Sequence, residues 1–296
     1  MSTNVARSAI ARPPKLSLIV ATIGRAEQLR RLFTSLVGQC SQDFELLVVD
    51  QSLNDDVVAP LVHEFSGLLR LTYLRDDGRG LSRARNIGLG QAKGTYLAFP
   101  DDDCWYHGGV IRSVIAFFDR NPDIGIYSGI YTEPGRKNPN FPMKPCELSP
   151  RNLWGRACSV GLFLKREALE GCSLLFDERI GAGTDMPIGE EIDLMMCLLL
   201  AGVRGYYDPS LIIYHAIHRE KIFSQASNVA VRKAFWYVVG KNYRPFLSEA
   251  KLARGVAACF LRRSPYGIGT DLSAVLAGFR EGLRARRSLP GAVSRS

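Results

Sequence analysis

Three consecutive aspartates follow an apolar stretch in this chain of 296 residues. The stretch runs from Tyr96 to Pro100 and leads directly into Asp101, Asp102 and Asp103. Adjacent carboxylates repel one another, so a strand end that ionises all three needs a positive partner. Mg²⁺ and Mn²⁺ prefer oxygen ligands, and Mg²⁺ usually takes one or two carboxylates together with phosphate oxygens. The triplet therefore indicates either a metal site that holds a phosphorylated substrate or a solvated acidic turn.

The elements around the triplet predict an α/β fold with a largely parallel sheet. Apolar runs indicate strands at 15–22, 45–50, 69–74 and 95–100, and helical spacing indicates helices at 29–37, 57–65, 82–91 and 110–118. Alternating strands and helices form right-handed crossovers, which bring the carboxyl ends of the strands to one edge. Ligands of such sheets bind beyond that edge. Thr22, Asp50 and the aspartate triplet are expected to meet there.

The second half of the chain is less regular. Strands are expected at 124–132, 159–165, 204–208 and 211–215, and a helix at 190–202 with Gly202 at its end. Two segments, 133–150 and 176–189, are expected to be loops. Neither a Walker P-loop nor a Gly-x-Gly-x-x-Gly after a strand is present, so these two common nucleotide-binding loops are not indicated.

Six pieces of sequence resemble the family 2 glycosyltransferases, which have the GT-A fold. In order they are 19–25 (IVATIGR), 48–50 (VVD), 80–88 (GLSRARNIG), 94–103 (GTYLAFPDDD), 189–193 (GEEID) and 214–215 (YH). The resemblance covers about residues 15 to 218. It implies an inverting enzyme that uses a nucleotide-diphosphate sugar, such as a UDP-, dTDP- or GDP-sugar. The Gln-x-x-Arg-Trp motif of processive synthases is absent, so transfer of a single sugar is expected.

The resemblance also implies roles for particular residues. The metal, Mg²⁺ or Mn²⁺, is expected at Asp103 and Asp102, with His215 as a further ligand and His218 as its weaker alternative. Residues expected to bind the nucleotide or the donor sugar are Ala21, Thr22, Ile23, Arg25, Asp50, Arg83, Asp101 and Asp102. A divalent cation would neutralise the charge that develops on the leaving diphosphate.

The expected catalytic base is Glu191. The family has Glu-Asp where this chain has Glu190-Glu191, and the Asp takes the proton of the acceptor hydroxyl. The start of a helix also favours the anionic carboxylate. Since Glu is one methylene longer than Asp, Glu190 or Asp193 remain alternatives for this role. Ordinary charge at a helix start is the alternative explanation for Glu190 and Glu191.

The C-terminal part of the chain is strongly basic. Residues 219–296 hold 15 Lys and Arg against 4 Asp and Glu, whereas residues 1–218 hold 23 against 25. The expected organisation is a flexible lead at 1–14, a GT-A catalytic domain at 15–218 and a basic helical extension at 219–296. Basic amphipathic helices with aromatic residues suit an anionic membrane surface, with packing against the catalytic domain as the alternative. No nucleic-acid motif accompanies the charge.

Composition indicates a cytoplasmic protein, with peripheral attachment to the inner face of a membrane as a further possibility. No apolar run is long enough to span a bilayer, no signal peptide is visible, and the seven cysteines form no Cys-x-x-Cys pair. The expected acceptor is a hydroxyl group, on a lipid-linked or polysaccharide precursor of the cell envelope. Two other functions remain open: a metal-dependent nucleotidyltransferase, and a non-catalytic membrane-associated partner protein.

Overall fold

The computed structural model describes residues 12–53, 57–173, 175–216, 225–243, 245–261 and 268–287. Most of the expected N-terminal lead, the expected domain boundary near residue 218 and His218 lie outside these ranges.

An eight-stranded sheet forms the centre of the molecule, in the order β3-β2-β1-β4-β7-β5-β8-β6. The strands are β1 (Leu16–Thr22), β2 (Phe44–Asp50), β3 (Leu71–Arg75), β4 (Tyr96–Ala98), β5 (Ile124–Thr132), β6 (Cys146–Glu147), β7 (Leu162–Lys165) and β8 (Arg204–Tyr214). β1 pairs in parallel with β2 and β4, and β5 pairs in parallel with β8, whereas β7 and β6 run against their neighbours. The predicted α/β fold with a mostly parallel sheet is confirmed.

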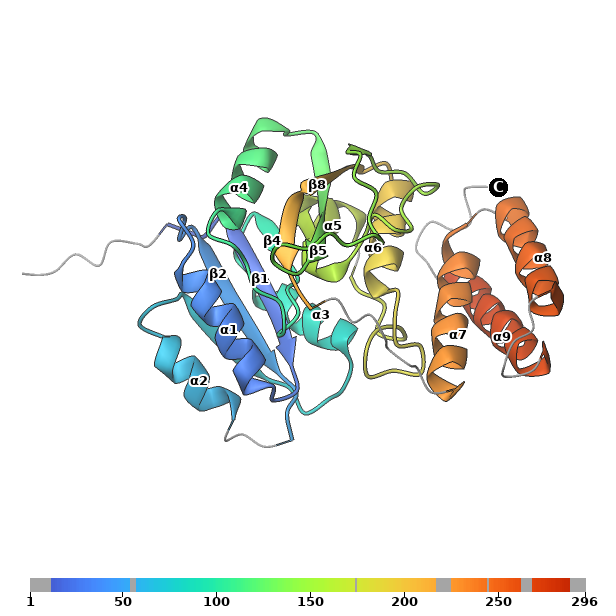
Figure 1. Ribbon diagram of the computed structural model, residues 1–296, viewed down its shortest axis with the longest axis horizontal. Coiled ribbons are helices and arrows are strands. Elements are labelled where there is room, and N and C mark those ends of the chain that lie inside the picture. Colours follow the sequence, from blue (N-terminus) through green and yellow to red (C-terminus); the bar gives the residue numbers. More distant parts are fainter. Residues whose placement is uncertain are drawn as a thin grey trace, which may run out of the picture.

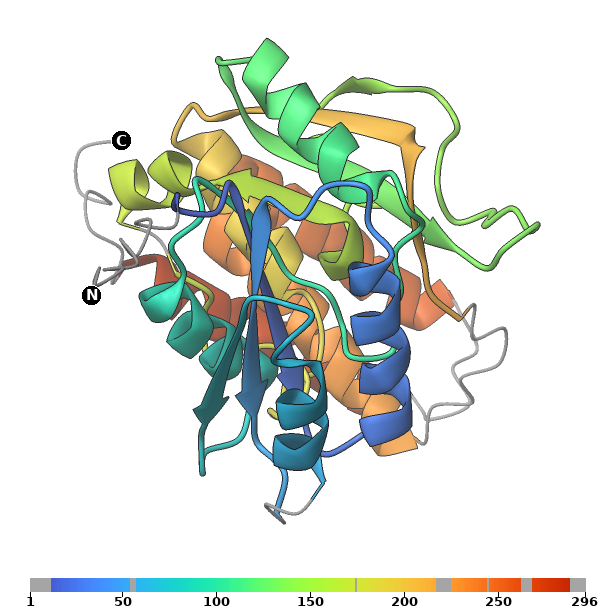
Figure 2. The ribbon, with the colours of Figure 1, turned by 90° about the vertical axis from the view of Figure 1, so that its left-hand side faces the viewer.

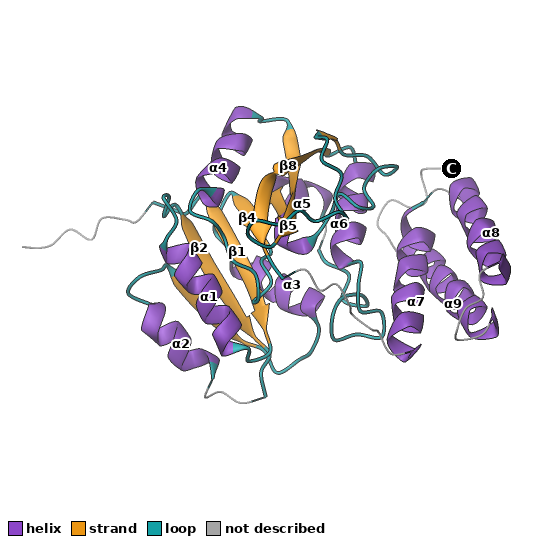
Figure 3. Cartoon of the chain, viewed as in Figure 1, coloured by secondary structure: helices purple, strands orange, loops and turns teal. Residues whose placement is uncertain are grey.

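Helices cover both faces of this sheet, as Figures 2 and 3 show. They are α1 (Ala26–Val37), α2 (Val58–Phe65), α3 (Leu81–Gln91), α4 (Val110–Arg120), the 3₁₀ turn η1 (Ser159–Gly161), α5 (Arg166–Cys172) and α6 (Glu190–Leu200). In Figure 2, α1 and α2 lie on one face and α3 on the other. Covered on both sides, β1 and β2 are almost continuously apolar and buried, as parallel strands require.

The register of the strands brings the expected site residues to one edge. Thr22, at the end of β1, pairs with Asp50, at the end of β2. An isolated bridge joins Ala21 to Asp101, just beyond β4. The predicted meeting of these strand ends with the aspartate triplet is therefore confirmed.

Two elements of the second half differ from the prediction. The expected strand at 159–165 begins as the turn η1, and only Leu162–Lys165 forms a strand, β7. The two expected strands at 204–208 and 211–215 are one strand, β8, whose register against β5 shifts at Asp208 to Leu211. This shift contains Pro209, which lacks a backbone N–H for the ladder, so the sequence pattern breaks where the strand continues.

Three further helices, α7 (Gln225–Asn242), α8 (Pro245–Leu261) and α9 (Ile268–Arg287), form a group beside the sheet. Figure 1 shows α6 between the sheet and this group. The backbones of α7 and α9 approach closely, because a Cβ atom at Gly278 or Gly282 of α9 would overlap the backbone of α7. Among the described helices, none has the length and apolar character that crossing a membrane requires.

Candidate active site

Two carboxylates and an imidazole form a cluster at the carboxyl edge of the sheet. Ligand atoms of Asp101, Asp103 and His215 all lie within 4.8 Å of one another. Asp101 is placed by its bridge to β1, and His215 directly follows β8. Carboxylate oxygens suit Mg²⁺ and Mn²⁺, and an imidazole nitrogen is a further ligand for Mn²⁺. The fold thus assembles a donor set from segments more than a hundred residues apart.

The contact between Asp103 and His215 tests whether this cluster fits a cation. Nδ1 of His215 lies 2.8 Å from the carbonyl oxygen of Ala216, so Nδ1 holds a proton and donates it. Nε2 lies 2.9 Å from Oδ1 of Asp103, and among the described residues no donor other than His215 reaches this buried oxygen. With His215 neutral, two lone pairs face each other, and a proton or a metal ion must stabilise them. The cluster therefore fits Mg²⁺ or Mn²⁺.

Protonation of His215 is the alternative to the metal ion. Burial alone would lower the pKa of His215, but the hydrogen bond and the charge of Asp103 raise it overall. Burial alone would raise the pKa of Asp103. Hydrogen bonds and charges from His215 and Arg25 outweigh burial and bring the pKa of Asp103 below its usual range. The site therefore attracts positive charge, whether that charge is a proton or a metal cation.

Asp102 has different partners from its two neighbours. It is 1% exposed, and it accepts hydrogen bonds from Oγ1 of Thr22 at 2.7 Å and from Nε of Arg25 at 3.1 Å. Burial raises the pKa of Asp102 to about 6, although Thr22 and Arg25 act to lower it. The cluster of candidate ligand atoms at this edge contains Asp101 rather than Asp102, and Asp102 as a metal ligand stays a prediction.

Arg25 was expected to reach the donor phosphate, and it lies beside the metal cluster. Its guanidinium pairs with both oxygens of Asp102 and lies 2.9 Å from Oδ2 of Asp103. The side chain remains 45% exposed. Its neighbour Ile23 is an exposed large apolar side chain, at 69%. Both residues therefore border solvent at the edge where a ligand would bind, and Ala21 is half-buried near the end of β1.

The expected nucleoside contact, Asp50, is fully buried. One carboxylate oxygen accepts from the backbone N–H of Ser52 at 2.8 Å, and the other accepts from the hydroxyl of Tyr73 at 2.7 Å. Arg75 adds a longer ion pair at 3.5 Å. Asp50 thus fixes the ends of β2 and β3, and its role as a nucleoside contact stays a prediction.

Asp76 is a member of this edge that sequence analysis missed. It follows β3 and binds Arg83 through Nε and Nη2, with Nη2 at 2.9 Å, and it also accepts from Gln51 at 2.8 Å. The hydrogen bonds of Arg83 are the main reason that the pKa of Asp76 falls to about 2. Its position after a predicted strand was the available signal. The expected nucleotide contact Arg83 therefore faces Asp76 at this edge.

The three acidic residues at the start of α6 have separate environments. Gly189, with φ at 96°, ends the preceding loop and starts the helix. Glu190 is buried and paired with Arg85 at 2.9 Å. Asp193 is buried and accepts from Lys241 at 2.6 Å and from Asn242 at 2.7 Å. Within the described residues, the half-buried Glu191 pairs with no cationic side chain and accepts no hydrogen bond from another residue.

Glu191 is therefore the acid of this helix that is available for proton transfer. Burial, and next the negative charge of Glu190, raise the pKa of Glu191 above the ordinary value of 4.5. A base with a raised pKa holds a proton more firmly once it has taken one, which suits general-base catalysis near neutral pH. Glu190 and Asp193 are already engaged by buried cations.

Arg85 connects the metal cluster with α6, and sequence analysis did not identify it. Its side chain is 1% exposed, and its guanidinium lies 3.1 Å from Asp101 and 2.9 Å from Glu190. The rings of Phe176 and Phe99 lie 5.4 and 6.0 Å from the guanidinium carbon. A buried cation with two carboxylate partners fixes the distance between the elements that carry those partners, here the end of β4 and the start of α6.

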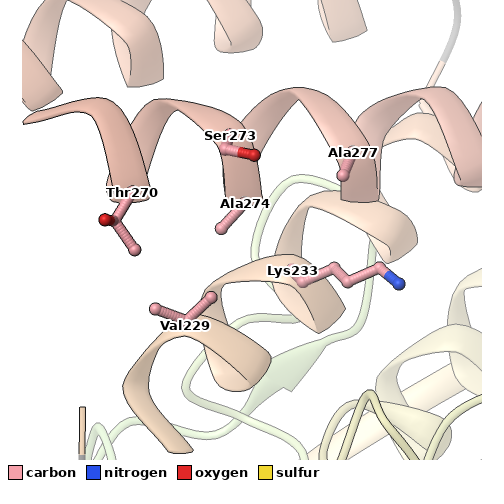
Figure 4. A pocket seen from close by; sticks show the side chains of 6 residues that line it. All are labelled: Val229, Lys233, Thr270, Ser273, Ala274 and Ala277. Carbon is pink, nitrogen blue, oxygen red and sulfur yellow. The ribbon is translucent and has the colours of Figure 1, made fainter. Parts of the chain in front are cut away.

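A groove of about 510 Å³ lies elsewhere, between α7 and α9 (Figure 4). Val229 and Lys233 line it from α7, and Thr270, Ser273, Ala274 and Ala277 line it from α9. It contains no acidic side chain, and Lys233 is paired with Glu281 at 2.9 Å. The groove therefore offers no carboxylate ligand for a metal ion, and the carboxylates at the sheet edge remain the candidate site.

Solved structures share this fold. The structure of Staphylococcus aureus TarS 1-349 in complex with UDP-GlcNAc superposes with a TM-score of 0.61 at 19% identity, covering 95% of this chain and 76% of that one. The mannosyltransferase PcManGT from Pyrobaculum calidifontis, in complex with GDP-Man and Mn²⁺, gives 0.56 at 16% identity, covering 97% and 77%. At these identities the likeness shows the fold alone, which is the GT-A fold.

Sequence comparison names the family. A family model described as Glycosyl transferase family 2 matches residues 17–166, just over half of the chain, and the protein belongs to this family. An uncharacterized glycosyltransferase of Haemophilus influenzae is 29% identical over 143 residues, 47% of each chain. The Campylobacter jejuni GalNAc(5)-diNAcBac-PP-undecaprenol beta-1,3-glucosyltransferase is 33% identical over 104 residues, 34% of each chain. The matches thus span about half or less of these relatives' length.

Proposed function

We propose that this protein is a metal-dependent, inverting glycosyltransferase that moves one sugar from a nucleotide-diphosphate sugar to a hydroxyl acceptor. One observation carries the proposal. A cluster suited to a divalent cation, Asp101, Asp103 and His215, is joined through buried Arg85 to the helix that carries the available carboxylate, Glu191. The carboxylates proposed to serve the leaving group are thus separate from the carboxylate proposed to serve the nucleophile, and both sets lie at one edge of the same sheet.

The residues divide the reaction between them. A Mg²⁺ or Mn²⁺ ion held by Asp101, Asp103 and His215 would supply positive charge for the leaving diphosphate. Glu191 takes the proton of the acceptor hydroxyl as its oxygen bonds to the anomeric carbon. The bond from that carbon to the diphosphate oxygen breaks, and its electron pair leaves with the nucleoside diphosphate. Arg25 adds a cation beside the cluster, where negative charge develops.

The donor is proposed to lie along the ends of β1, β2 and β3. This edge is bordered by Ala21, Ile23 and Arg25. Asp50 is buried at the same edge, and Arg83 forms an ion pair with Asp76. UDP-GlcNAc and GDP-Man are bound in two proteins of this fold, so UDP-, dTDP- and GDP-sugars are the donors to test. A lipid-linked hydroxyl acceptor is supported by the Campylobacter relative, whose name gives an undecaprenol-linked substrate.

A panel of nucleotide sugars tests the proposal. Thermal unfolding would be followed with UDP-GlcNAc, UDP-glucose, dTDP-glucose and GDP-mannose, each with Mn²⁺ and with EDTA. One sugar is expected to raise Tm with Mn²⁺ and to lose that effect with EDTA, since a ligand that binds only the folded state stabilises it.

The product of the same reaction separates the alternatives. Release of a nucleoside diphosphate from that sugar supports glycosyl transfer, whereas release of pyrophosphate from a nucleoside triphosphate would identify a nucleotidyltransferase. A protein that neither binds nor cleaves any member of the panel would contradict the proposal.

A further inference from the structure

A buried lysine joins the C-terminal helices to the candidate active site. The ammonium group of Lys241, on α7, lies 2.6 Å from Asp193 and 2.8 Å from Asp177. Lys241 is 5% exposed, and the hydroxyl of Tyr237 and the amide of Asn242 donate to the same two carboxylates. A buried charge is tolerated when such partners surround it.

Both carboxylates belong to segments that form the site. Asp193 lies in the first turn of α6, two residues after Glu191. Asp177 lies near the start of the loop 176–189, which leads into α6. The same loop contacts α3, because the hydroxyl of Ser82 donates a hydrogen bond to the carbonyl of Ile180. The ammonium of Lys241 therefore holds the helix of the proposed base together with the loop before it.

The helix that carries Lys241 is itself fixed from the other side. A Cβ atom at Gly240 would lie 2.5 Å from the carbonyl oxygen of Phe279, so α7 and α9 are in backbone contact beside Lys241. A second close contact joins α7 to α8: the ring of Trp236, on α7, packs directly against Gly255 of α8, where a Cβ atom would overlap the ring. Because α7 has so little space to shift, the position of the Lys241 ammonium group is well defined. A buried ion pair of this kind fixes the relative position of two elements better than an exposed ion pair does.

We propose that Lys241 is a positioning residue, through which the C-terminal helices hold α6 and Glu191 in the geometry needed for proton transfer. This inference rests on the proposed function. It makes α7 to α9 part of the catalytic unit, although the family match ends at residue 166. Burial would lower the pKa of Lys241, yet Asp193 and Asp177 raise it overall, so the ammonium keeps its charge over the working pH range.

The experiment compares substitutions at two lysines of α7. Lys241→Met removes the charge with little change of shape. Lys241→Gln, which keeps hydrogen-bond donors, takes its place if the Met variant does not fold. Lys241→Arg restores the positive charge. Lys233→Met is the matched control, because Lys233 pairs with Glu281 of α9 and lies outside the site. The reaction followed is nucleoside diphosphate release from the sugar chosen by the panel, with Mn²⁺ and with water as the acceptor.

A split between binding and turnover is the expected result. With kcat expressed per donor-binding site, Lys241→Met should lower kcat roughly ten- to hundredfold and leave donor Kd unchanged, as a small misplacement of a catalytic group does. Lys241→Arg should recover most of kcat, and Lys233→Met should match the wild type. The inference would be overturned if kcat per site were unchanged in both Lys241→Met and Lys241→Gln. It would also be overturned if Lys233→Met lowered kcat as much as Lys241→Met does.

Glu191→Gln in the same assay separates failure of this inference from failure of the proposed function. If the wild type releases no nucleoside diphosphate, or if Glu191→Gln turns over as fast as the wild type, the proposed function or its base is wrong. If Glu191→Gln is inactive and the Lys241 variants are unaffected, only the positioning role is wrong.

Discussion

The three aspartates after β4 differ in what they contact. Asp101 pairs with buried Arg85, Asp102 with Thr22 and Arg25, and Asp103 with His215 and Arg25. Each carboxylate is thus oriented by a different part of the chain. The cluster of Asp101, Asp103 and His215 presents oxygen and nitrogen donors together, whereas Asp102 stabilises the turn between β1 and α1.

Substitution of single aspartates distinguishes these roles. Asp101→Asn is expected to weaken Mn²⁺-dependent donor binding by at least about tenfold, because an amide is a poorer ligand than a carboxylate. Asp102→Asn should have a smaller effect on the Mn²⁺ concentration that gives half-maximal binding. Titration calorimetry with the donor at varied Mn²⁺ measures both, and an Asp102→Asn effect larger than that of Asp101→Asn would restore Asp102 as the metal ligand.

The pH dependence of transfer reports on Glu191. A base must be deprotonated to act, and its pKa is raised above 4.5 by burial and by Glu190, so the rate should rise with pH through that raised pKa. Glu191→Gln should bind donor normally and lose about 10²- to 10⁴-fold in kcat, together with the acidic limb of the profile. A Glu191→Gln enzyme with the wild-type pH profile would place the base elsewhere.

Among the elements, α6 is held on two sides. Glu190 connects its start to Arg85 of α3, and Asp193 connects its first turn to Lys241 of α7. Both connections use buried ion pairs with further hydrogen bonds, and such pairs fix geometry more than they add stability. The helix that carries Glu191 therefore depends on contacts with α3 and α7 for its place.

Removal of one partner from the Arg85 pair should be costly. Arg85→Met leaves Glu190 buried without its cation, and breaking such a pair costs about 3–5 kcal/mol of unfolding free energy. Urea denaturation measures this loss, and Arg85→Met/Glu190→Gln should recover part of it. Arg30→Ala is the matched control, because its pair with Glu64 is about half exposed and should matter little. Equal losses in Arg85→Met and Arg30→Ala would show that Arg85 is not a structural link.

At the scale of the whole molecule, positive charge gathers on the C-terminal helices. Arg254 of α8 and Arg280 and Arg284 of α9 are exposed. Such residues suit the anionic surface of a membrane that carries a lipid-linked acceptor, and we keep peripheral attachment at the cytoplasmic face as a proposal.

Vesicle binding tests this proposal. Arg254→Gln/Arg280→Gln/Arg284→Gln should lower partitioning onto vesicles that contain phosphatidylglycerol by roughly a hundredfold, at about 1 kcal/mol for each charge near the surface. Arg70→Gln/Arg112→Gln/Arg120→Gln removes three exposed charges from the catalytic part and is the control. Cosedimentation measures both, and equal losses would show that net charge alone governs binding.

Sequence alone determined the parallel α/β sheet, its carboxyl edge and the family, because hydrophobic periodicity and short motifs are local properties. It also placed the aspartate triplet after a strand, where the structure has it. It predicted Glu191 as the catalytic base, with Glu190 and Asp193 as alternatives, and it missed Asp76, Arg85 and Lys241.

Only the tertiary structure showed which partners these side chains have, because the partners are distant in the chain. Arg85 and Glu190 are 105 residues apart, and Lys241 and Asp193 are 48 apart. Which carboxylate keeps a free oxygen depends on which cations fold against it, and folding brings those cations from other helices. For the same reason the structure groups Asp101, rather than Asp102, with Asp103 and His215.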